Sequence, residues 1–270
     1  MPQPVARIAA RPLDDLPDAA LADVAGVLTD IDDTLTRDGA IEPAALDALQ
    51  RLHAAGLPVI AITGRPMGWS EPFARTWPVA AIVAENGAVA LFRDGAGLTT
   101  EYSQDGPTRS RNARRLREVT TRLLREVPGI AMAQDSAGRV TDIAVDHSEF
   151  AHLDPAGMAQ VVALMRAEGM VATVSSIHIN GWFGEHDKWS GARWIVRRLL
   201  GRDLDAEVSR WVYVGDSTND QLMFRHFPLS VGVANLMRFA GQLSDWPAYI
   251  TPGERGTGFA QVADRVLAAR

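Results

Sequence analysis

Short apolar runs alternate with helix-length segments over much of the chain. Three of these runs, Val24–Asp30, Leu57–Thr63 and Val79–Ala84, have the length and composition of buried strands. Between the first two, the apolar residues of Pro43–Ala55 recur at helical spacing, and Gly56 stands where a helix can end. Strands separated by a helix predict a parallel sheet, because a parallel connection has to cross back along the sheet.

The middle of the chain has a different pattern. Ala88–Arg93, Val140–Asp146 and Met170–Ile179 are strand-like runs of alternating or mixed polarity. Between them lie two segments with helical spacing, Arg109–Val127 and Asp154–Glu168. Strands that are polar on one side, together with two helices, predict a small α+β insert.

The pattern of the first part then returns, in Trp189–Leu200, Trp211–Val214, Gln221–Phe227, Leu229–Val233, Tyr249–Thr251 and Gly258–Ala269. We therefore predict one α/β core with a parallel sheet, formed by residues 1–87 and 183–270. An α+β insert over residues 88–182 splits this core in the sequence. A short helix is also expected within 14–24, in a polar lead-in that precedes the first strand.

Composition narrows the class of protein. The absence of cysteine excludes disulfides, thiolate metal sites and a thiol nucleophile. A net charge of -6 argues against nucleic-acid binding, which usually goes with a basic excess. The apolar runs are shorter than the roughly 18–20 residues of a membrane span. The N-terminal segment lacks the continuous apolar core of a secretory signal. We therefore expect a cytoplasmic protein that binds neither nucleic acid nor membranes.

An acidic loop follows the first predicted strand directly, with the sequence Asp30-Ile31-Asp32-Asp33-Thr34. In an open α/β sheet, ligands bind at the carboxyl ends of the strands. There, Asp30 can attack phosphorus, and Asp32 can protonate the leaving oxygen and then activate water. A single acidic residue in such a place is more often part of a turn. The hypothesis therefore depends on the loops that come later in the chain.

Three later segments supply complementary groups. Thr63-Gly64-Arg65-Pro66 can offer a hydroxyl and backbone N–H groups to a phosphate. Lys188, at the start of a predicted helix, can neutralise the charge of that phosphate. Gly215-Asp216-Ser217-Thr218-Asn219-Asp220 adds two carboxylates, and oxygen ligands suit Mg²⁺. Each of these segments, taken alone, is common in turns, in helix caps or, for a lysine, on the protein surface. The evidence for a phosphate and metal site is therefore the order in which the segments occur.

In type and order, these residues resemble the four motifs of the haloacid dehalogenase superfamily. Asp30, Asp32 and Thr34 match its Asp-x-Asp-x-Thr motif, and Thr63 and Lys188 match the second and third motifs. Gly215-Asp216 with Asn219-Asp220 matches the fourth motif. The second aspartate of the first motif is found in the phosphatases of the superfamily and is missing from the dehalogenases.

The resemblance extends to a subfamily. Ala84-Glu85-Asn86-Gly87-Ala88 and the place of the insert, between the second and third motifs, resemble phosphatases with a type IIB (C2B) cap. Sucrose-phosphate, mannosyl-3-phosphoglycerate and trehalose-phosphate phosphatases and the Cof-like hydrolases are similar in layout. The lead-in before Asp30 departs from the family, whose members often begin almost at the first strand.

The resemblance implies a Rossmann-like core with an inserted cap, a Mg²⁺ cofactor and an aspartyl-phosphate formed on Asp30. It implies that Mg²⁺ is held by the Asp30 carboxylate, the Asp32 backbone carbonyl and the Asp216 carboxylate, with Asp220 acting through a metal-bound water. It also implies a phosphate site, made by Thr63, Gly64, Lys188 and Asn219.

Substrate specificity is expected in the cap and where the cap joins the core. Strand alternation puts Ser176, His178 and Asn180 on one face, where they could read sugar hydroxyls. Arg65 and Asn86 are further candidate substrate-binding residues. For the three cap residues, a place on the solvated side of a sheet is at least as common an explanation.

The sequence therefore predicts a phosphoric monoester hydrolase that acts on a small phosphorylated metabolite, with a sugar phosphate favoured, as a monomer or homodimer. Two alternatives stay open. A phosphomutase of the same fold would return the phosphoryl group to the sugar. A non-catalytic Mg²⁺ and phosphate sensor, or a receiver-like phosphoacceptor, would not need Asp32 or a large cap.

Overall fold

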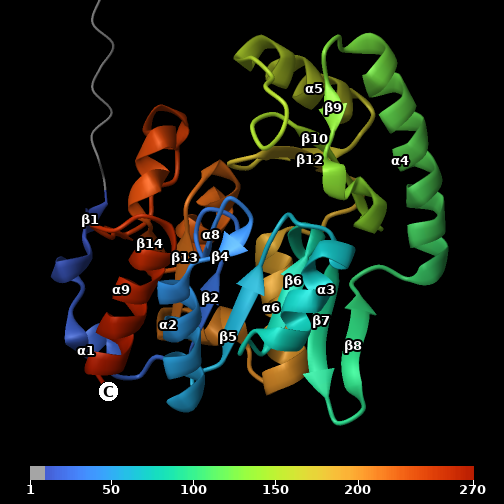
Figure 1. The fold of residues 1–270 in the computed structure, drawn as a ribbon. Coiled ribbons are helices and arrows are strands. Elements are labelled where there is room, and N and C mark those ends of the chain that lie inside the picture. The colour runs from blue at the N-terminus through green and yellow to red at the C-terminus, as the bar shows by residue number, and fades with distance from the viewer. Residues whose placement is uncertain (1–9) are drawn as a thin grey trace, which may run out of the picture. The chain divides into compact units, whose positions relative to one another are not determined.

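The computed structural model describes residues 10–270, and residues 1–9 of the predicted lead-in lie outside the described residues. The chain forms two compact units (Figure 1). The first unit comprises residues up to 61, 77–80 and 200–270, and the second comprises residues 62–76 and 81–199. These boundaries differ from those of the expected core and insert. The division into 1–87 with 183–270 and 88–182 therefore stays a prediction.

The first unit is built on a parallel sheet with the strand order β1-β15-β14-β13-β2-β5. These strands are β1 (Arg11–Pro12), β2 (Gly26–Thr29), β5 (Val59–Ile62), β13 (Trp211–Gly215), β14 (Leu229–Gly232) and β15 (Tyr249–Ile250). A short hairpin, β3 (Thr36–Arg37) and β4 (Ala40–Ile41), follows β2. The helices are α1 (Asp18–Leu21), α2 (Pro43–Ala54), α7 (Leu204–Glu207), α8 (Gln221–His226) and α9 (Arg255–Ala268). Turns of 3-10 helix are η1 (Leu13–Asp15), η4 (Val208–Arg210), η5 (Thr218–Asp220) and η6 (Ala234–Gln242). The predicted parallel sheet with helical connections is confirmed.

Helices α2 and α9 pack against each other on the first unit (Figure 1). The side chains that α2 buries have the spacing of one helical face and are Ala45, Ala48, Leu49 and Leu52. Just past its end, Gly56 has a φ of +73°, in the left-handed region that favours glycine. The predicted helix and its glycine stop are therefore confirmed.

In the second unit, β6 (Ala81–Ala84), β7 (Val89–Asp94) and β8 (Gly97–Tyr102) pair antiparallel in sequence order. A separate antiparallel sheet has the order β11-β12-β10-β9. Its strands are β9 (Ala131–Met132), β10 (Asp142–Asp146), β11 (Val171–Val174) and β12 (His178–Trp182). The helices are α3 (Met67–Thr76), α4 (Gly106–Glu126), α5 (Pro155–Ala167) and α6 (Lys188–Leu200), with 3-10 turns η2 (Glu85–Gly87) and η3 (Gln134–Gly138).

The two faces of the β10–β12 pair differ in polarity. Val145 of β10 lies opposite Ile179 of β12, and both belong to an apolar cluster with residues of α4 and α5. The neighbouring cross-strand pairs, Ala144 with Asn180 and Asp146 with His178, point to the other face because side chains alternate along a strand. The predicted α+β insert is confirmed in its sheet, its two helices and its two-sided strands.

The expected strand Met170–Ile179 is instead a hairpin of β11 and β12. The Ser175 hydroxyl oxygen accepts hydrogen bonds from the N–H groups of Ile177 and His178, at 3.3 and 3.0 Å. Serine stabilises turns in this way, by replacing strand partners with its own side chain. A segment that reads as one continuous strand in the sequence therefore forms two strands joined by a turn at Ser175.

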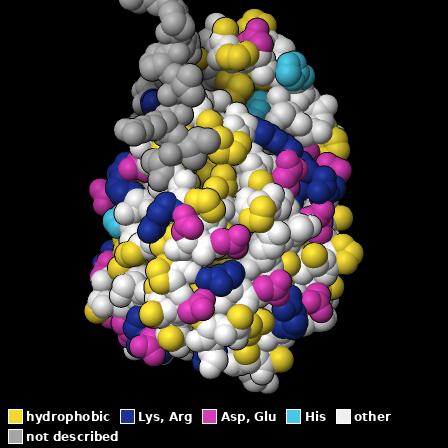
Figure 2. All heavy atoms as spheres, turned by 90° about the vertical axis from the view of Figure 1, so that its left-hand side faces the viewer, with side chains coloured by type: hydrophobic (Ala, Val, Ile, Leu, Met, Phe, Trp, Pro, Cys, Tyr) yellow, Lys and Arg dark blue, Asp and Glu magenta, His cyan; other side chains and the backbone are white. Residues whose placement is uncertain are grey.

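Acidic and basic side chains are interspersed on the face that Figure 2 shows. Over residues 10–270, no helix combines the length and the apolar character that crossing a bilayer requires.

Candidate functional site

Strands β2 and β13 are neighbours in the parallel sheet, and each ends in an acidic loop. Thr29 of β2 lies opposite Val214 of β13. Asp30 comes next in the chain, is buried, and donates its backbone N–H to the Val214 carbonyl at 2.9 Å. Asp216 follows the end of β13 and is buried as well. The parallel register thus brings Asp30 and Asp216 to one edge of the sheet.

The loop after β13 is folded around Asp220. One carboxylate oxygen of Asp220 accepts the N–H groups of Asp216 and Ser217, at 2.9 and 3.1 Å. The other accepts the hydroxyl of Tyr213 at 2.5 Å. Asn219 lies in the same turn, where its side-chain oxygen accepts the Ser217 hydroxyl at 2.8 Å. These bonds fix the loop that carries two of the predicted metal-site carboxylates.

Three buried carboxylates gather at this place. Asp30, Asp216 and Asp220 each offer an oxygen atom, and these atoms lie within 4.8 Å of one another. Like charges held so close under burial repel, and a divalent cation offsets that repulsion. The donor set is all oxygen, which is the chemistry that Mg²⁺ prefers. The residues present therefore fit the predicted metal.

A second set of contacts orients Asp216. Asn235, just after β14, donates its side-chain N–H groups to Asp216 Oδ2 at 3.1 Å and to the Asp33 carbonyl at 2.9 Å. Arg255 donates its backbone N–H to Asn235 Oδ1 at 2.9 Å and its Nε to Asp33 Oδ1 at 2.6 Å. Asp32, directly before Asp33 in the sequence, is half-buried. Loops after β2 and β14 and the start of α9 are thus joined around one carboxylate.

Three residues that the sequence pattern did not indicate hold the acidic loops: Tyr213, Asn235 and Arg255. A tyrosine inside an apolar strand is a usable signal, because its buried hydroxyl needs a partner. Asn235 is a polar residue just past a buried strand, the position at which ligand sites form in α/β sheets. Arg255 gives no comparable signal, since its partner Asp33 is far away in the sequence.

The residues predicted to hold the phosphate are divided between the units. Asn219 lies in the first unit, and Thr63, Gly64 and Lys188 lie in the second. Thr63 is buried directly after β5, and Lys188 is buried at the start of α6. A buried lysine is rare and is normally paired. Their joint role at a phosphate stays a prediction.

Two of the predicted substrate-binding residues meet at a glutamate that the sequence analysis missed. Arg65 donates to Glu149 at 2.6 Å and to Asp135 at 3.2 Å, and its guanidinium lies 4.9 Å from the centre of the Trp69 ring. His178 Nε2 lies 2.8 Å from the other oxygen of Glu149. Burial raises the pKa of Glu149, but hydrogen bonds from His178 and Arg65 outweigh burial and lower it to about 2.

The other predicted substrate-binding residues lie nearby in the second unit. Asn180 is buried and donates to the Asp142 carboxylate at 3.0 Å and to the Gly64 carbonyl at 3.2 Å. Asn86 is buried in the turn between β6 and β7, with a φ of 55°. Ser176 accepts the Ser148 hydroxyl at its carbonyl, at 2.8 Å. A substrate-binding role for all five residues stays a prediction.

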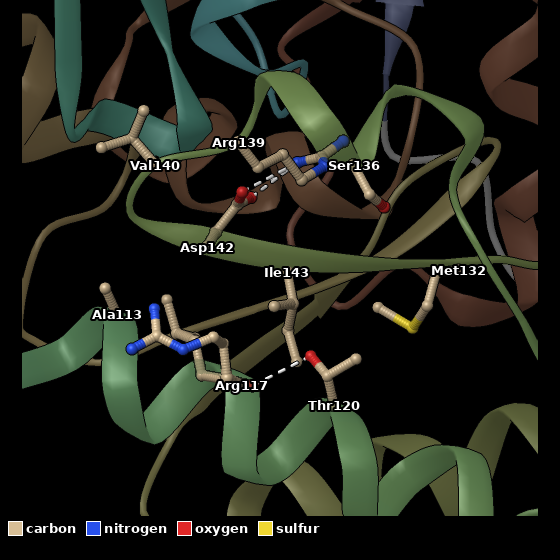
Figure 3. Close-up of a pocket in the computed structure, with 10 residues that line it drawn as sticks. Ala113, Arg117, Thr120, Met132, Ser136, Arg139, Val140, Asp142 and Ile143 are labelled. Carbon is tan, nitrogen blue, oxygen red and sulfur yellow. Dashed lines mark hydrogen bonds and ion pairs between the residues drawn. The ribbon is translucent and has the colours of Figure 1, made fainter.

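A cavity of about 240 Å³ lies in the second unit, between α4 and β10 (Figure 3). Leu116 and Thr120 of α4 face it from one side, and Met132 and Ile143 line it from the sheet. Its lining includes none of the site residues predicted from the sequence, so it is a feature separate from the acidic cluster.

Residues 27–105 match the model of the haloacid dehalogenase-like hydrolase family. A Thermoplasma acidophilum protein shares the fold with a TM-score of 0.68 at 18% identity, over 90% of this chain and 98% of its own. The similarity extends over almost the whole of both chains, so the two proteins share the entire fold. The chain has the haloacid dehalogenase-like hydrolase fold. Among curated proteins, none matches it in sequence.

Two further structures of this fold have stated activities. The sucrose-phosphatase of Synechocystis, solved with sucrose and phosphate, has a TM-score of 0.64 at 15% identity, over 90% of this chain and 98% of its own. A haloacid dehalogenase subclass IIB sugar phosphatase has a TM-score of 0.63 at 15% identity, over 92% and 100%. The predicted resemblance to the haloacid dehalogenase superfamily with a type IIB cap is confirmed, together with the predicted fold class.

Proposed function

We propose that this haloacid dehalogenase-like protein is a Mg²⁺-dependent phosphatase that hydrolyses a small phosphorylated metabolite. The observation that carries the proposal is the buried cluster of Asp30, Asp216 and Asp220 at the carboxyl edge of the parallel sheet. Asp32, two residues after Asp30, supplies the second acid that phosphoryl transfer to water requires. In this proposal Asp30 is the nucleophile.

The metal site consists of Asp30, the Asp32 carbonyl and Asp216, with Asp220 in a supporting role. Asp220 already accepts three hydrogen bonds, from Tyr213, Asp216 and Ser217, which suits contact through a water better than direct binding. Bound Mg²⁺ would offset the negative charge of the phosphoryl group and of the nucleophile. Asn235 holds Asp216 in the orientation in which its carboxylate shares the cluster.

The protein's own groups account for both halves of the reaction. The Asp30 carboxylate attacks phosphorus, and the bond from phosphorus to the leaving oxygen breaks while Asp32 gives that oxygen a proton. The product alcohol departs and Asp30 carries the phosphoryl group. Asp32, now ionised, takes a proton from a water molecule that attacks phosphorus. The bond to Asp30 breaks, which restores both carboxyl groups and releases inorganic phosphate.

A sugar phosphate is the favoured substrate. Two structures with the same fold are a sucrose-phosphatase and a sugar phosphatase by name. In this chain, the polar face of the β10–β12 sheet carries His178 and Asn180, which suit hydroxyl groups. Thr63, Gly64, Lys188 and Asn219 would bind the phosphate, and Arg65, Asn86 and Ser176 stay candidates for contact with the rest of the substrate.

The first test is phosphate release from a panel of sugar phosphates, nucleotides and phosphoglycerate derivatives with Mg²⁺. We expect release from at least one sugar phosphate, its loss on addition of EDTA, and no turnover by Asp30→Asn. The reason is that an amide at residue 30 has no anionic oxygen to attack phosphorus. Asp47→Asn, the same change at an exposed aspartate of α2, is the matched control and keeps full activity.

Turnover by Asp30→Asn at the rate of the control would refute the nucleophile, and release that is insensitive to EDTA would refute the metal. Release that requires a sugar bisphosphate activator would favour the phosphomutase.

A further inference from the structure

The Thr63 hydroxyl is oriented by the peptide unit that follows it. Thr63 Oγ1 accepts the backbone N–H of Arg65 at 3.0 Å. A hydroxyl that accepts at its oxygen directs its own hydrogen elsewhere, so Thr63 is set up as a donor. Its backbone is fixed as well, because the Thr63 N–H donates to Val83 at 2.9 Å and its carbonyl accepts from Asn86 at 3.0 Å.

The Arg65 N–H and the Gly64 carbonyl belong to one planar peptide unit, so fixing one fixes the direction of the other. Two side chains hold that carbonyl: Arg139 Nη1 at 3.0 Å and Asn180 Nδ2 at 3.2 Å. A Cβ atom on residue 64 would lie 3.2 Å from Asn180 Oδ1, so glycine keeps the approach open. Both donors come from the predicted cap, whereas Gly64 lies in the loop after β5.

Arg139 is itself held rigidly. Its guanidinium donates to both oxygens of Asp142 at 2.9 Å (Figure 3). It also donates to Asp135 from Nε and Nη2, at 3.2 and 3.0 Å. Both Arg139 and Asp142 are buried side chains in ion pairs. A planar fork in such a site gives several directed bonds at once, which an ammonium cannot reproduce. These hydrogen bonds hold the buried Arg139 guanidinium in a fixed orientation.

We infer that Arg139 and Asn180 are positioning residues for the phosphate-binding hydroxyl of Thr63, acting through the Gly64–Arg65 peptide. The inference rests on the proposed function, in which Thr63 binds the phosphate. It makes two residues of the cap part of the machinery that binds the group common to all substrates. A substitution in the cap then alters phosphate affinity as well as the choice of sugar.

A double-mutant cycle tests this chain of contacts. KM for the best substrate and the inhibition constant of inorganic phosphate are measured for wild type, Arg139→Lys, Thr63→Val and the double variant. Arg139→Lys keeps the positive charge but removes the planar guanidinium group. We expect KM and the inhibition constant of phosphate to rise about tenfold. We expect kcat to change little, because the ground state and the transition state lose the same contact. In the Thr63→Val background the same substitution is expected to change both constants less than about twofold.

Two further variants complete the design. Asn180→Ala removes the other donor to Gly64 and is expected to give the same pattern with smaller changes. It also serves as the test if Arg139→Lys does not fold. Arg122→Lys is the matched control, because Arg122 forms its ion pairs with Glu126 and Glu168 instead of with the Asp135 and Asp142 carboxylates that hold Arg139. Its constants are expected to equal those of wild type.

Equal effects of Arg139→Lys with and without the Thr63 hydroxyl would overturn the inference and leave the proposed function in place. So would unchanged constants in both Arg139→Lys and Asn180→Ala. A wild-type protein that releases no phosphate from any compound would overturn the proposed function, and the inference with it.

Discussion

Tyr213 is the side chain that connects the buried strand β13 to the acidic cluster. Burial and the neighbouring Asp220 carboxylate raise the pKa of Tyr213 well above its ordinary value. The phenol therefore keeps its proton and donates to Asp220 at any working pH. Asp220 in turn holds the Asp216 N–H, so one hydroxyl stabilises the loop that carries two of the three carboxylates.

Replacing Tyr213 with phenylalanine should weaken both the fold and the proposed metal site. The lost bond is to a charged group, so the free energy of unfolding should fall by about 1.5–3 kcal/mol. The midpoint of a Mg²⁺ titration, followed by the rise in Tm, should move to higher concentration. Tyr249→Phe removes a hydroxyl that contacts Arg11 and is the control. Identical Mg²⁺ midpoints in the two variants would contradict the role given to Tyr213.

At the scale of secondary-structure elements, the η2 turn between β6 and β7 joins segments that are distant in the sequence. Glu85 in this turn accepts backbone N–H groups from Met67 at 3.0 Å, Val140 at 3.1 Å and Thr141 at 2.6 Å. Burial, with a contribution from the charge of Asp142, raises the pKa of Glu85 to about 7 despite these hydrogen bonds. The start of α3 and the segment before β10 are thus tied to one carboxyl group that titrates near neutrality.

This raised pKa predicts a pH-dependent stability. Between the ordinary glutamate pKa of 4.5 and the raised pKa of about 7, folded Glu85 binds a proton that the unfolded chain has released. The free energy of unfolding should therefore fall as pH rises through this window, by an amount on the order of 3 kcal/mol. Glu85→Gln removes this fall, so the wild-type advantage over the variant should shrink from pH 5 to pH 7 in thermal melts.

The comparison with Glu85→Gln is needed because two histidines make the free energy of unfolding rise with pH, opposite to the effect of Glu85. Burial lowers the pKa of His147, and lowers that of His186 to about 4, so both favour the folded state as pH rises. Glu71→Gln, on the exposed side of α3, controls for the loss of one carboxylate. If the difference in Tm between wild type and Glu85→Gln stayed the same from pH 5 to pH 7, a neutral Glu85 would be ruled out.

For the molecule as a whole, the cluster of Asp30, Asp216 and Asp220 concentrates repulsion in a chain that is already acidic. The net charge is -6, and three of the negative charges lie buried within 4.8 Å of one another. The loops after β2 and β13 are held in this arrangement by the fold of the first unit. A cation that binds only the folded chain adds its binding free energy to the stability of the protein.

Mg²⁺ should therefore raise the Tm of the wild-type protein. At about 100 times its Kd the gain is about 2.7 kcal/mol, which corresponds to roughly 5–10 °C for a chain of this size. EDTA should reverse the rise. Asp216→Asn should abolish it and, without Mg²⁺, should be at least as stable as wild type because one repelling charge is gone. Asp264→Asn, at an exposed aspartate, should respond like wild type, and an undiminished rise in Asp216→Asn would exclude this residue as a ligand.

Local patterns in the sequence were enough to predict much of the fold and the loops that carry the clustered carboxylates Asp30, Asp216 and Asp220. Buried parallel strands are covered on both faces, so β2 and β13 are short continuous apolar runs, and the acidic residues that follow them mark their ends. The helix α2 and its stop at Gly56 follow from spacing and backbone freedom. These features are determined by residues that are close together in the chain, so they can be predicted from the local sequence pattern.

Contacts between distant segments were decided only by the tertiary structure. Asn235 reaches the Asp33 carbonyl across 202 positions, and Glu85 reaches Thr141 across 56. Strand β8 and the turn at Ser175 were missed because partners and side-chain bonds, rather than local β pattern, determine them. The sequence by itself determined the apolar strands of the parallel sheet, the helices α2, α4 and α5 and the acidic loops, because each depends on the spacing of neighbouring residues. The tertiary structure decided which buried groups hold those loops, because burying a polar group requires a partner that the chain brings from elsewhere.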